Sequence, residues 1–139
     1  MAQTMTGGCA CGAIRYEARG EPIFTANCYC RDCQRCTGTA VTSVLVFPLD
    51  AVAITGEARY FVVGGDTGNL VNRGFCANCG SPLFTRPELL PDAIAIKAAS
   101  LDDPNQFSPQ MECYVDSAPS WATLTAGVTK FRKAPELPG

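Results

Sequence analysis

The chemistry open to this chain is set by its nine cysteines and its lack of histidine. The cysteines fall into three groups and one outlier. They are Cys9 and Cys11, then Cys28, Cys30, Cys33 and Cys36 in the stretch CYCRDCQRC, then Cys76 and Cys79, and finally Cys113. An odd number leaves one cysteine over in any disulfide framework, and clustered cysteines in a reducing compartment are more often metal ligands. The lack of histidine excludes Cys₂His₂ zinc fingers, Cys–His nucleophile pairs and Ser–His triads.

The first and third groups have the spacing of half zinc sites. Cys76 and Cys79 lie in CANCG, a C-x-x-C followed by glycine, and Cys9 and Cys11 in CACG are two residues apart, so they share one face of an extended chain. Structural zinc takes four ligands in a tetrahedron, so each pair needs a second pair. The simplest combination joins the two pairs in one structural zinc site, whose metal would contribute directly to folding.

The second group allows two kinds of site. If Cys28, Cys30 and Cys33 alone bind zinc, the metal keeps one exchangeable position, as catalytic zinc does. If Cys36 is the fourth ligand, the site is closed and structural, and spacing alone does not decide between the two. A redox C-x-x-C is a weaker interpretation because no βαβ pattern surrounds it. A metal-free thiol reductase would have only Cys36 and Cys113 as nucleophiles, and a lone cysteine such as Cys113 is typically a small buried residue.

Short β-strands are the elements that must position these cysteines. Apolar and β-branched runs predict strands at 13–17, 40–47, 51–55, 58–63, 69–75, 93–100 and 111–116. No long window has a helical period, so helix is expected only in a turn after Cys30 and in another near Pro119–Trp121. Ten prolines and thirteen glycines divide the 139-residue chain into short pieces. This favours an all-β sandwich or a pair of barrel-like sheets in a single domain, residues 1–139.

Composition and charge limit the partners and the location. The chain carries 11 basic and 13 acidic residues, a net charge of −2, and no block of lysine or arginine, so a nucleic-acid partner is not expected. The N-terminus lacks the basic and apolar regions of a secretory signal, and no apolar run is long enough to suggest a membrane span. We therefore expect a cytoplasmic protein with no membrane partner.

Five stretches of the chain resemble, in this order, the glutathione-dependent formaldehyde-activating enzyme (GFA) family, also called the centromere-protein-V family. They are GGCACGAIRYE, CYCRDCQRCTG, GFCANCGSPLF, KAASLDDP and APSWATL, and they span about residues 7–131. The resemblance implies one GFA-like zinc-binding domain of small, folded-over antiparallel sheets (the β-tent type) with zinc knuckles and little helix. It also implies two zinc ions per chain. The expected ligands are Cys9, Cys11, Cys76 and Cys79 for a structural zinc, and Cys28, Cys30 and Cys33 for a catalytic zinc.

Four further positions carry expectations. Cys36 stands where the family usually has no cysteine, which favours the open site. Tyr29, between two expected ligands, stands where many relatives have histidine, and we expect it to pack beside the site. Cys113 lies in a strand that commonly carries no thiol in the family. Glu112, next to it, is expected on a solvated strand face.

The family reaction joins glutathione and formaldehyde to S-hydroxymethylglutathione, so the resemblance implies a zinc-dependent carbon–sulfur lyase. A free thiol with a pKa of about 8.5 is only a few per cent thiolate at neutral pH, whereas coordination to a metal deprotonates it. A site with three cysteine thiolates and a substrate thiolate is a poor Lewis acid, but it keeps the substrate sulfur nucleophilic. Arginines pair with carboxylates, of which glutathione has two. The candidate contacts are Arg31, Arg35, Arg73 and Arg86. The alternative function is a non-catalytic zinc scaffold that binds a protein partner and has two closed Cys₄ sites.

Overall fold

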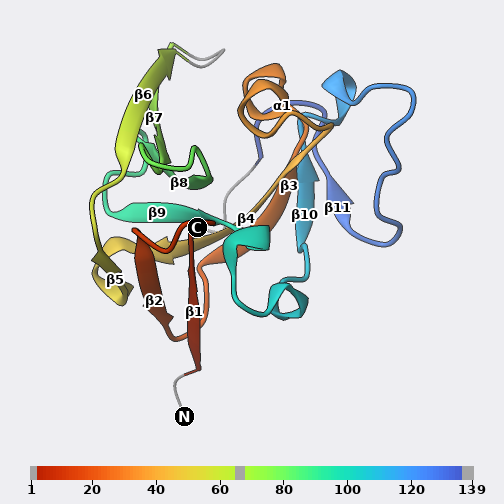
Figure 1. The fold of residues 1–139 in the computed structure, drawn as a ribbon. Helices are drawn as coiled ribbons and strands as arrows, with labels where there is room; N and C mark the ends of the chain where they lie inside the picture. Colours follow the sequence, from red (N-terminus) through yellow and green to blue (C-terminus); the bar gives the residue numbers. More distant parts are fainter. Residues whose placement is uncertain (1–2, 65–67, 136–139) are drawn as a thin grey trace.

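The computed structural model describes residues 3–64 and 68–135, which form a mostly β protein (Figure 1). Its strands are β1 (Thr4–Gly8), β2 (Arg15–Arg19), β3 (Phe24–Cys28), β4 (Thr42–Pro48), β5 (Val52–Thr55), β6 (Arg59–Gly64), β7 (Leu70–Phe75), β8 (Pro82–Pro87), β9 (Ala93–Lys97), β10 (Met111–Cys113) and β11 (Thr129–Lys130). The helix is α1 (Arg31–Thr37), and single-turn 3₁₀ helices lie at Leu49–Ala51, Ala98–Ser100, Pro104–Gln106 and Val115–Ser117.

The strands form two sheets. Strands β1, β2 and β5 make a small antiparallel sheet, and the others make a larger sheet in the order β11-β10-β3-β4-β9-β8-β7-β6. Across the larger sheet, each pair of neighbouring strands from β3 through β4, β9, β8 and β7 to β6 is antiparallel. Strand β10 runs parallel to both of its neighbours, β3 and β11. The long connection from β9 to β10 permits this, since parallel neighbours need a crossover and not a tight turn. The expected fold of small, mostly antiparallel sheets with little helix is confirmed.

The main core lies between the two sheets. Tyr16 of β2 packs edge-to-face on Phe84 of β8, with ring centroids 5.7 Å apart. Along β9, Ile94 and Ile96 point into this core, whereas Ala95 points to the opposite face of the large sheet, because side chains alternate along a strand. The small alanine side chain leaves room for a cavity on that opposite face.

Helix α1 lies against β4 and begins directly after Cys30, where the sequence predicts a helical turn. Gly38 ends it with a φ of 75°, in the left-handed region that glycine adopts without strain. At the second expected turn, near Pro119–Trp121, the structure has one hydrogen-bonded turn that does not continue into a helix. There the N–H of Ala122 donates to the carbonyl of Pro119 at 3.0 Å in a single turn, and the threonines that follow favour extended backbone. No helix in the described residues has the length and apolar character needed to cross a membrane.

Candidate metal sites

Two tight turns, one between β1 and β2 and one between β7 and β8, bring four cysteines together. The sulfur atoms of Cys9, Cys11, Cys76 and Cys79 all lie within 4.8 Å of one another. The Sγ of Cys11 is 3.6 Å from that of Cys9 and 3.7 Å from that of Cys76. A disulfide would require about 2.05 Å. Sulfurs around a tetrahedral zinc, with Zn–S bonds of about 2.3 Å, lie about 3.8 Å apart. The observed spacing therefore fits a tetrahedral metal.

The two turns are built alike. A glycine follows the second cysteine of each and has a positive φ, 80° for Gly12 and 81° for Gly80. Each glycine N–H donates to the carbonyl oxygen of the first cysteine, at 3.2 Å for Cys9 and 2.7 Å for Cys76. Any other residue would be strained in this conformation. The glycines thus close the turns that hold the paired sulfurs together.

Hydrogen bonds favour negative charge on this cluster. The N–H of Ile14 donates to Cys9 Sγ at 3.3 Å and is the largest cause that lowers the pKa of Cys9. The Oγ of Ser81 lies 3.2 Å from Cys79 Sγ, and hydrogen bonds from Ser81 lower the pKa of Cys79 to about 5. Metal ligation needs the thiolate form, so both effects assist it.

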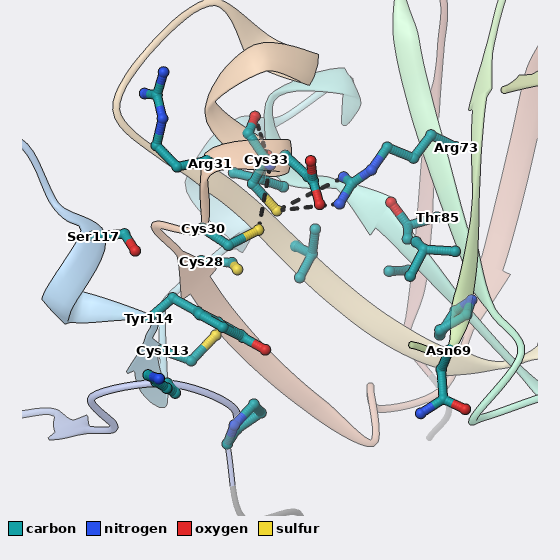
Figure 2. Close-up of a pocket in the computed structure, with 18 of the residues that line it drawn as sticks. Cys28, Cys30, Arg31, Cys33, Asn69, Arg73, Thr85, Cys113, Tyr114 and Ser117 are labelled. Carbon is teal, nitrogen blue, oxygen red and sulfur yellow. Dashed lines mark hydrogen bonds between the residues drawn. The ribbon is translucent and has the colours of Figure 1, made fainter. Parts of the chain in front are cut away.

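The second cluster lies where β3 ends and α1 begins. The sulfur atoms of Cys28, Cys30 and Cys33 lie within 4.8 Å of one another (Figure 2). Cys30 is the N-cap of α1, and its sulfur accepts a hydrogen bond from the N–H of Cys33 at 3.3 Å. The amide of Gln34 donates to the carbonyl of Tyr29 at 2.8 Å, which fixes the first turn of the helix to the end of the strand.

These three cysteines line one side of a pocket of about 480 Å³ (Figure 2). Aliphatic side chains make much of the remaining wall: Val44, Leu70, Val71, Pro87, Leu89 and Ala95. Arg31, Arg73 and Lys133 also line the pocket. The sulfur cluster thus has an open side that a small molecule can approach.

Cys36 lies outside this cluster. It is half-buried in the last part of α1 and lines a separate hollow with Phe61 and Val63 of β6. Within residues 3–64 and 68–135, the group of mutually close sulfurs at the end of β3 therefore has three members, and the Cys113 thiol contacts only Cys28 of this group. A four-coordinate metal held by them would be one ligand short.

The model of the glutathione-dependent formaldehyde-activating enzyme family matches residues 4–117, a span that contains both clusters. The chain belongs to this family. The resemblance read in the sequence is thereby confirmed. A crystal structure of a protein from Rhodobacter sphaeroides has a similar fold, with a TM-score of 0.58 and 18% identity over 91% of this chain and 99% of that chain. No curated protein matches the chain.

Zinc, which membership of the GFA family implies, fits both donor sets. Each cluster presents only cysteine sulfurs. Thiolates select zinc and similar metals over magnesium and calcium, which prefer oxygen. The four-sulfur cluster has the composition of a structural zinc site, and the three-sulfur cluster has the composition of a site with an exchangeable position.

The four arginines expected as substrate contacts separate into two groups. Arg31 lines the pocket from its exposed rim, and Arg73 of β7 reaches into it. Both Nη atoms of Arg73 lie 3.7 Å from Cys33 Sγ (Figure 2). Arg35 and Arg86 line other hollows. Only Arg31 and Arg73 of the four are therefore placed to act at the second cluster.

The pKa values of the three cysteines in the second cluster shift in opposite directions. Hydrogen bonds from the thiols of Cys28 and Cys30 are the largest causes that lower the pKa of Cys33, and Arg73 lowers it further. The pKa values of Cys28 and Cys30 are raised, that of Cys28 chiefly by the neighbouring Cys113 thiol. A thiolate on Cys33 would therefore lie next to the guanidinium of Arg73.

A buried network behind the cluster corrects the expectation for Glu112. This residue is fully buried, because β10 lies between β3 and β11, and is not on a solvated face. Its carboxylate accepts hydrogen bonds from Asn27 Nδ2 at 3.0 Å, the Tyr29 hydroxyl at 3.2 Å and the N–H of Thr125 at 2.9 Å. Burial acts to raise the pKa of Glu112, but these hydrogen bonds outweigh it and the pKa is lowered. The Tyr29 side chain belongs to this network, where burial raises its pKa to about 12.

Two further pocket residues had no functional signal in the sequence. Cys113 is buried, as expected for a lone cysteine, but the pairing of β10 with β3 makes it the register partner of Cys28. Tyr114 has a φ of 55°, which is uncommon for a residue other than glycine. Its conformation turns the chain out of β10 toward the segment that lines the pocket.

Proposed function

We propose that this protein is a zinc-dependent carbon–sulfur lyase-type enzyme that joins a small thiol, glutathione or a similar compound, to formaldehyde or another small aldehyde. One observation carries the proposal: the sulfurs of Cys28, Cys30 and Cys33 lie within 4.8 Å of one another beside an open pocket, and Cys113, which also lines the pocket, is not part of this group. A closed Cys₄ site is saturated, whereas a three-sulfur site accepts one more ligand from solution. In the same proposal the cluster at the two glycine turns holds a separate, structural zinc.

The ligands of the catalytic zinc in this proposal are Cys28, Cys30 and Cys33. When bound, the metal would supply the substrate sulfur as a thiolate at neutral pH. The first turn of α1 keeps Cys30 and Cys33 in register through the hydrogen bond from the Cys33 N–H to the Cys30 sulfur. Arg73 offsets the negative charge on Cys33.

The reaction itself needs little acid–base help. An electron pair of the thiolate sulfur forms a bond to the carbonyl carbon, the π pair of the carbonyl moves to oxygen, and that oxygen takes a proton from water. Formaldehyde is strongly electrophilic, which suits a chain with no histidine. The aliphatic side chains of Val44, Val71 and Leu89 make the pocket wall apolar.

Arg31 and Lys133 are the proposed contacts for substrate carboxylates, because both are exposed and both line the pocket. Arg73 is less suited to this role, because both of its Nη atoms already contact Cys33. The proposal also includes a single GFA-like domain over residues 1–139 that works in the reducing cytoplasm, where unpaired thiols persist.

An absorption titration of the cobalt-substituted protein tests the open site. Cobalt(II) adopts the geometry of zinc, and its thiolate charge-transfer band grows with each bound sulfur. We expect the band to grow by about a seventh when glutathione is added, because seven cysteine sulfurs become eight. The Cys36→Ser protein is the matched control and should give the same increase. If both fully loaded proteins show no increase with glutathione or 2-mercaptoethanol, the open site is refuted. Loss of formaldehyde in the presence of the zinc protein and glutathione then tests the reaction.

A further inference from the structure

Three buried side-chain atoms have no hydrogen-bond partner in the part of the chain that the structure describes. They are Arg73 Nε, Thr85 Oγ1 and Lys97 Nζ. Buried polar groups nearly always have partners, so this group requires an explanation. The three residues share one face of adjacent strands: Arg73 on β7 is the register partner of Thr85 on β8, and Thr85 is the partner of Ala95 on β9. Lys97 lies two residues beyond Ala95 and therefore on the same face.

That face of the sheet carries the three-cysteine cluster. Both Nη atoms of Arg73 lie 3.7 Å from Cys33 Sγ. Lys97 is only 6% exposed. Burial lowers the pKa of Lys97, and charge interactions with nearby cysteines oppose this effect. Among the described residues, neither cation forms an ion pair with a carboxylate.

Two buried cations without carboxylate partners are costly unless other negative charge lies close by. A metal-free cluster with one thiolate would balance only one of the two cations. A divalent metal with three thiolates carries one net negative charge, and it carries two when a substrate thiolate joins. The charges of Arg73, Lys97 and the metal site therefore cancel only in the thiolate-bound state, and one positive charge is left over before the substrate binds.

We propose that Arg73 and Lys97 are charge-balancing residues that make the three-cysteine site select an anionic fourth ligand, a thiolate, over a neutral one. This inference rests on the proposed function, because it requires a metal with three cysteine ligands. It adds the feature of the substrate that the site recognises. This feature is the negative charge of the sulfur and not the rest of the thiol molecule. In this proposal Arg73 balances the negative charge of the metal site and does not bind the carboxylates of the substrate.

The Lys97→Met variant of the cobalt-substituted protein tests this assignment. Methionine is similar in length and has no charge, so the packing around position 97 is largely kept. The probes are 2-mercaptoethanol, which has a thiol and no carboxylate, and imidazole, which binds metals as a neutral ligand. We expect the dissociation constant of 2-mercaptoethanol to rise by about 10- to 100-fold, the effect of one weakly screened charge at close range. The dissociation constant of imidazole should not change. Arg73→Gln should behave in the same way, and Arg73→Lys, which keeps the charge, should retain most of the thiol affinity.

The matched control is Arg19→Met, which removes an exposed cation of β2 that pairs with Glu17. It should leave the affinity for both probes unchanged. Equal 2-mercaptoethanol affinity in the wild-type and Lys97→Met proteins would overturn the inference. A parallel loss of imidazole binding would also overturn it, because structural damage would then explain both. A loss confined to glutathione would assign the cations to carboxylates and would overturn it too. All three results leave the open site intact, whereas a wild-type protein that binds no thiol overturns the proposed function and this inference together.

Discussion

Replacing Cys79 by serine removes one exposed sulfur from the four-cysteine cluster, and we expect it to lower the free energy of unfolding by about 4 kcal/mol. The cluster links distant parts of the chain, since Cys11 and Cys76 are 65 positions apart. A cross-link that closes a loop of this length restricts the unfolded chain by about 4 kcal/mol at 25 °C in the chain-entropy model. Serine is a poor zinc ligand, so the variant loses this cross-link. Because Cys79 is exposed, its replacement leaves no cavity in the core.

Urea unfolding under reducing conditions, with the zinc content of each protein determined, measures this effect. Cys36→Ser is the control, because Cys36 lies outside both clusters, and its free energy of unfolding should stay within about 1 kcal/mol of wild type. Free zinc must be removed first, since zinc bound by the unfolded chain reduces the difference. A Cys79→Ser protein that loses one zinc per chain and still unfolds within about 1 kcal/mol of wild type would refute the cross-link. A Cys79→Ser protein that binds zinc at this cluster as tightly as wild type would refute Cys79 as a ligand.

Three further substitutions test other parts of the molecule. The hydrogen bond from Arg15 is the main cause that lowers the pKa of Asp102 to about 2. The Asp102 carboxylate therefore stabilises the folded protein fully above its unfolded pKa of about 3.9, and this contribution to the free energy of unfolding is lost as the pH falls toward 2. The stability difference between wild type and Asp102→Asn, measured by urea unfolding across this range, should shrink accordingly, and a constant difference would contradict the assignment. Glu112→Gln puts an NH₂ donor where the buried carboxylate accepts three hydrogen bonds, and should lower the free energy of unfolding by about 1–3 kcal/mol; no change would show that the network is not required. Gly7→Ala places a methyl group against the Tyr16 hydroxyl, and the same assay should show a loss of about 1–3 kcal/mol unless β1 shifts freely.

Strand prediction from the sequence succeeded where burial gives a local pattern. Strands β4 and β9 lie in the middle of the large sheet, and their apolar runs mark them clearly. Strand β1 has only one large buried side chain, Met5, and two glycines, so it gives no such signal. Its place is fixed by pairing with β2 and by the hydrogen bond from Thr6 Oγ1 to Asp102 at 2.7 Å. Strand β8 begins and ends with proline, which argues against a strand in any local analysis.

The cysteine groups could be predicted from local sequence, whereas the residues around them could not. A cysteine pair followed by glycine is a local signal, because a few residues determine the turn. Lys97 interrupts the alternation in AIAIKAAS and would be expected to face solvent, yet it is buried beside the cysteine cluster. The register of β7, β8 and β9 brings it to the same face as Arg73 and Thr85. That register joins residues 10 or more positions apart, so no spacing in the sequence reveals it.

Helix α1 explains why four closely spaced cysteines do not gather into one four-sulfur cluster. Cys30 caps the helix and Cys33 lies in its first turn, so both sulfurs stay near the end of β3, where Cys28 lies. Cys36 comes three residues later, about 4.5 Å further along the helix axis, and faces the hollow beside β6. Bringing its sulfur to the cluster would unwind the helix and break the hydrogen bond from the Gly38 N–H to the Gln34 carbonyl, 2.8 Å long. The same short helix therefore groups three sulfurs and holds Cys36 away, so that in the proposed zinc site Cys36 does not supply the fourth ligand.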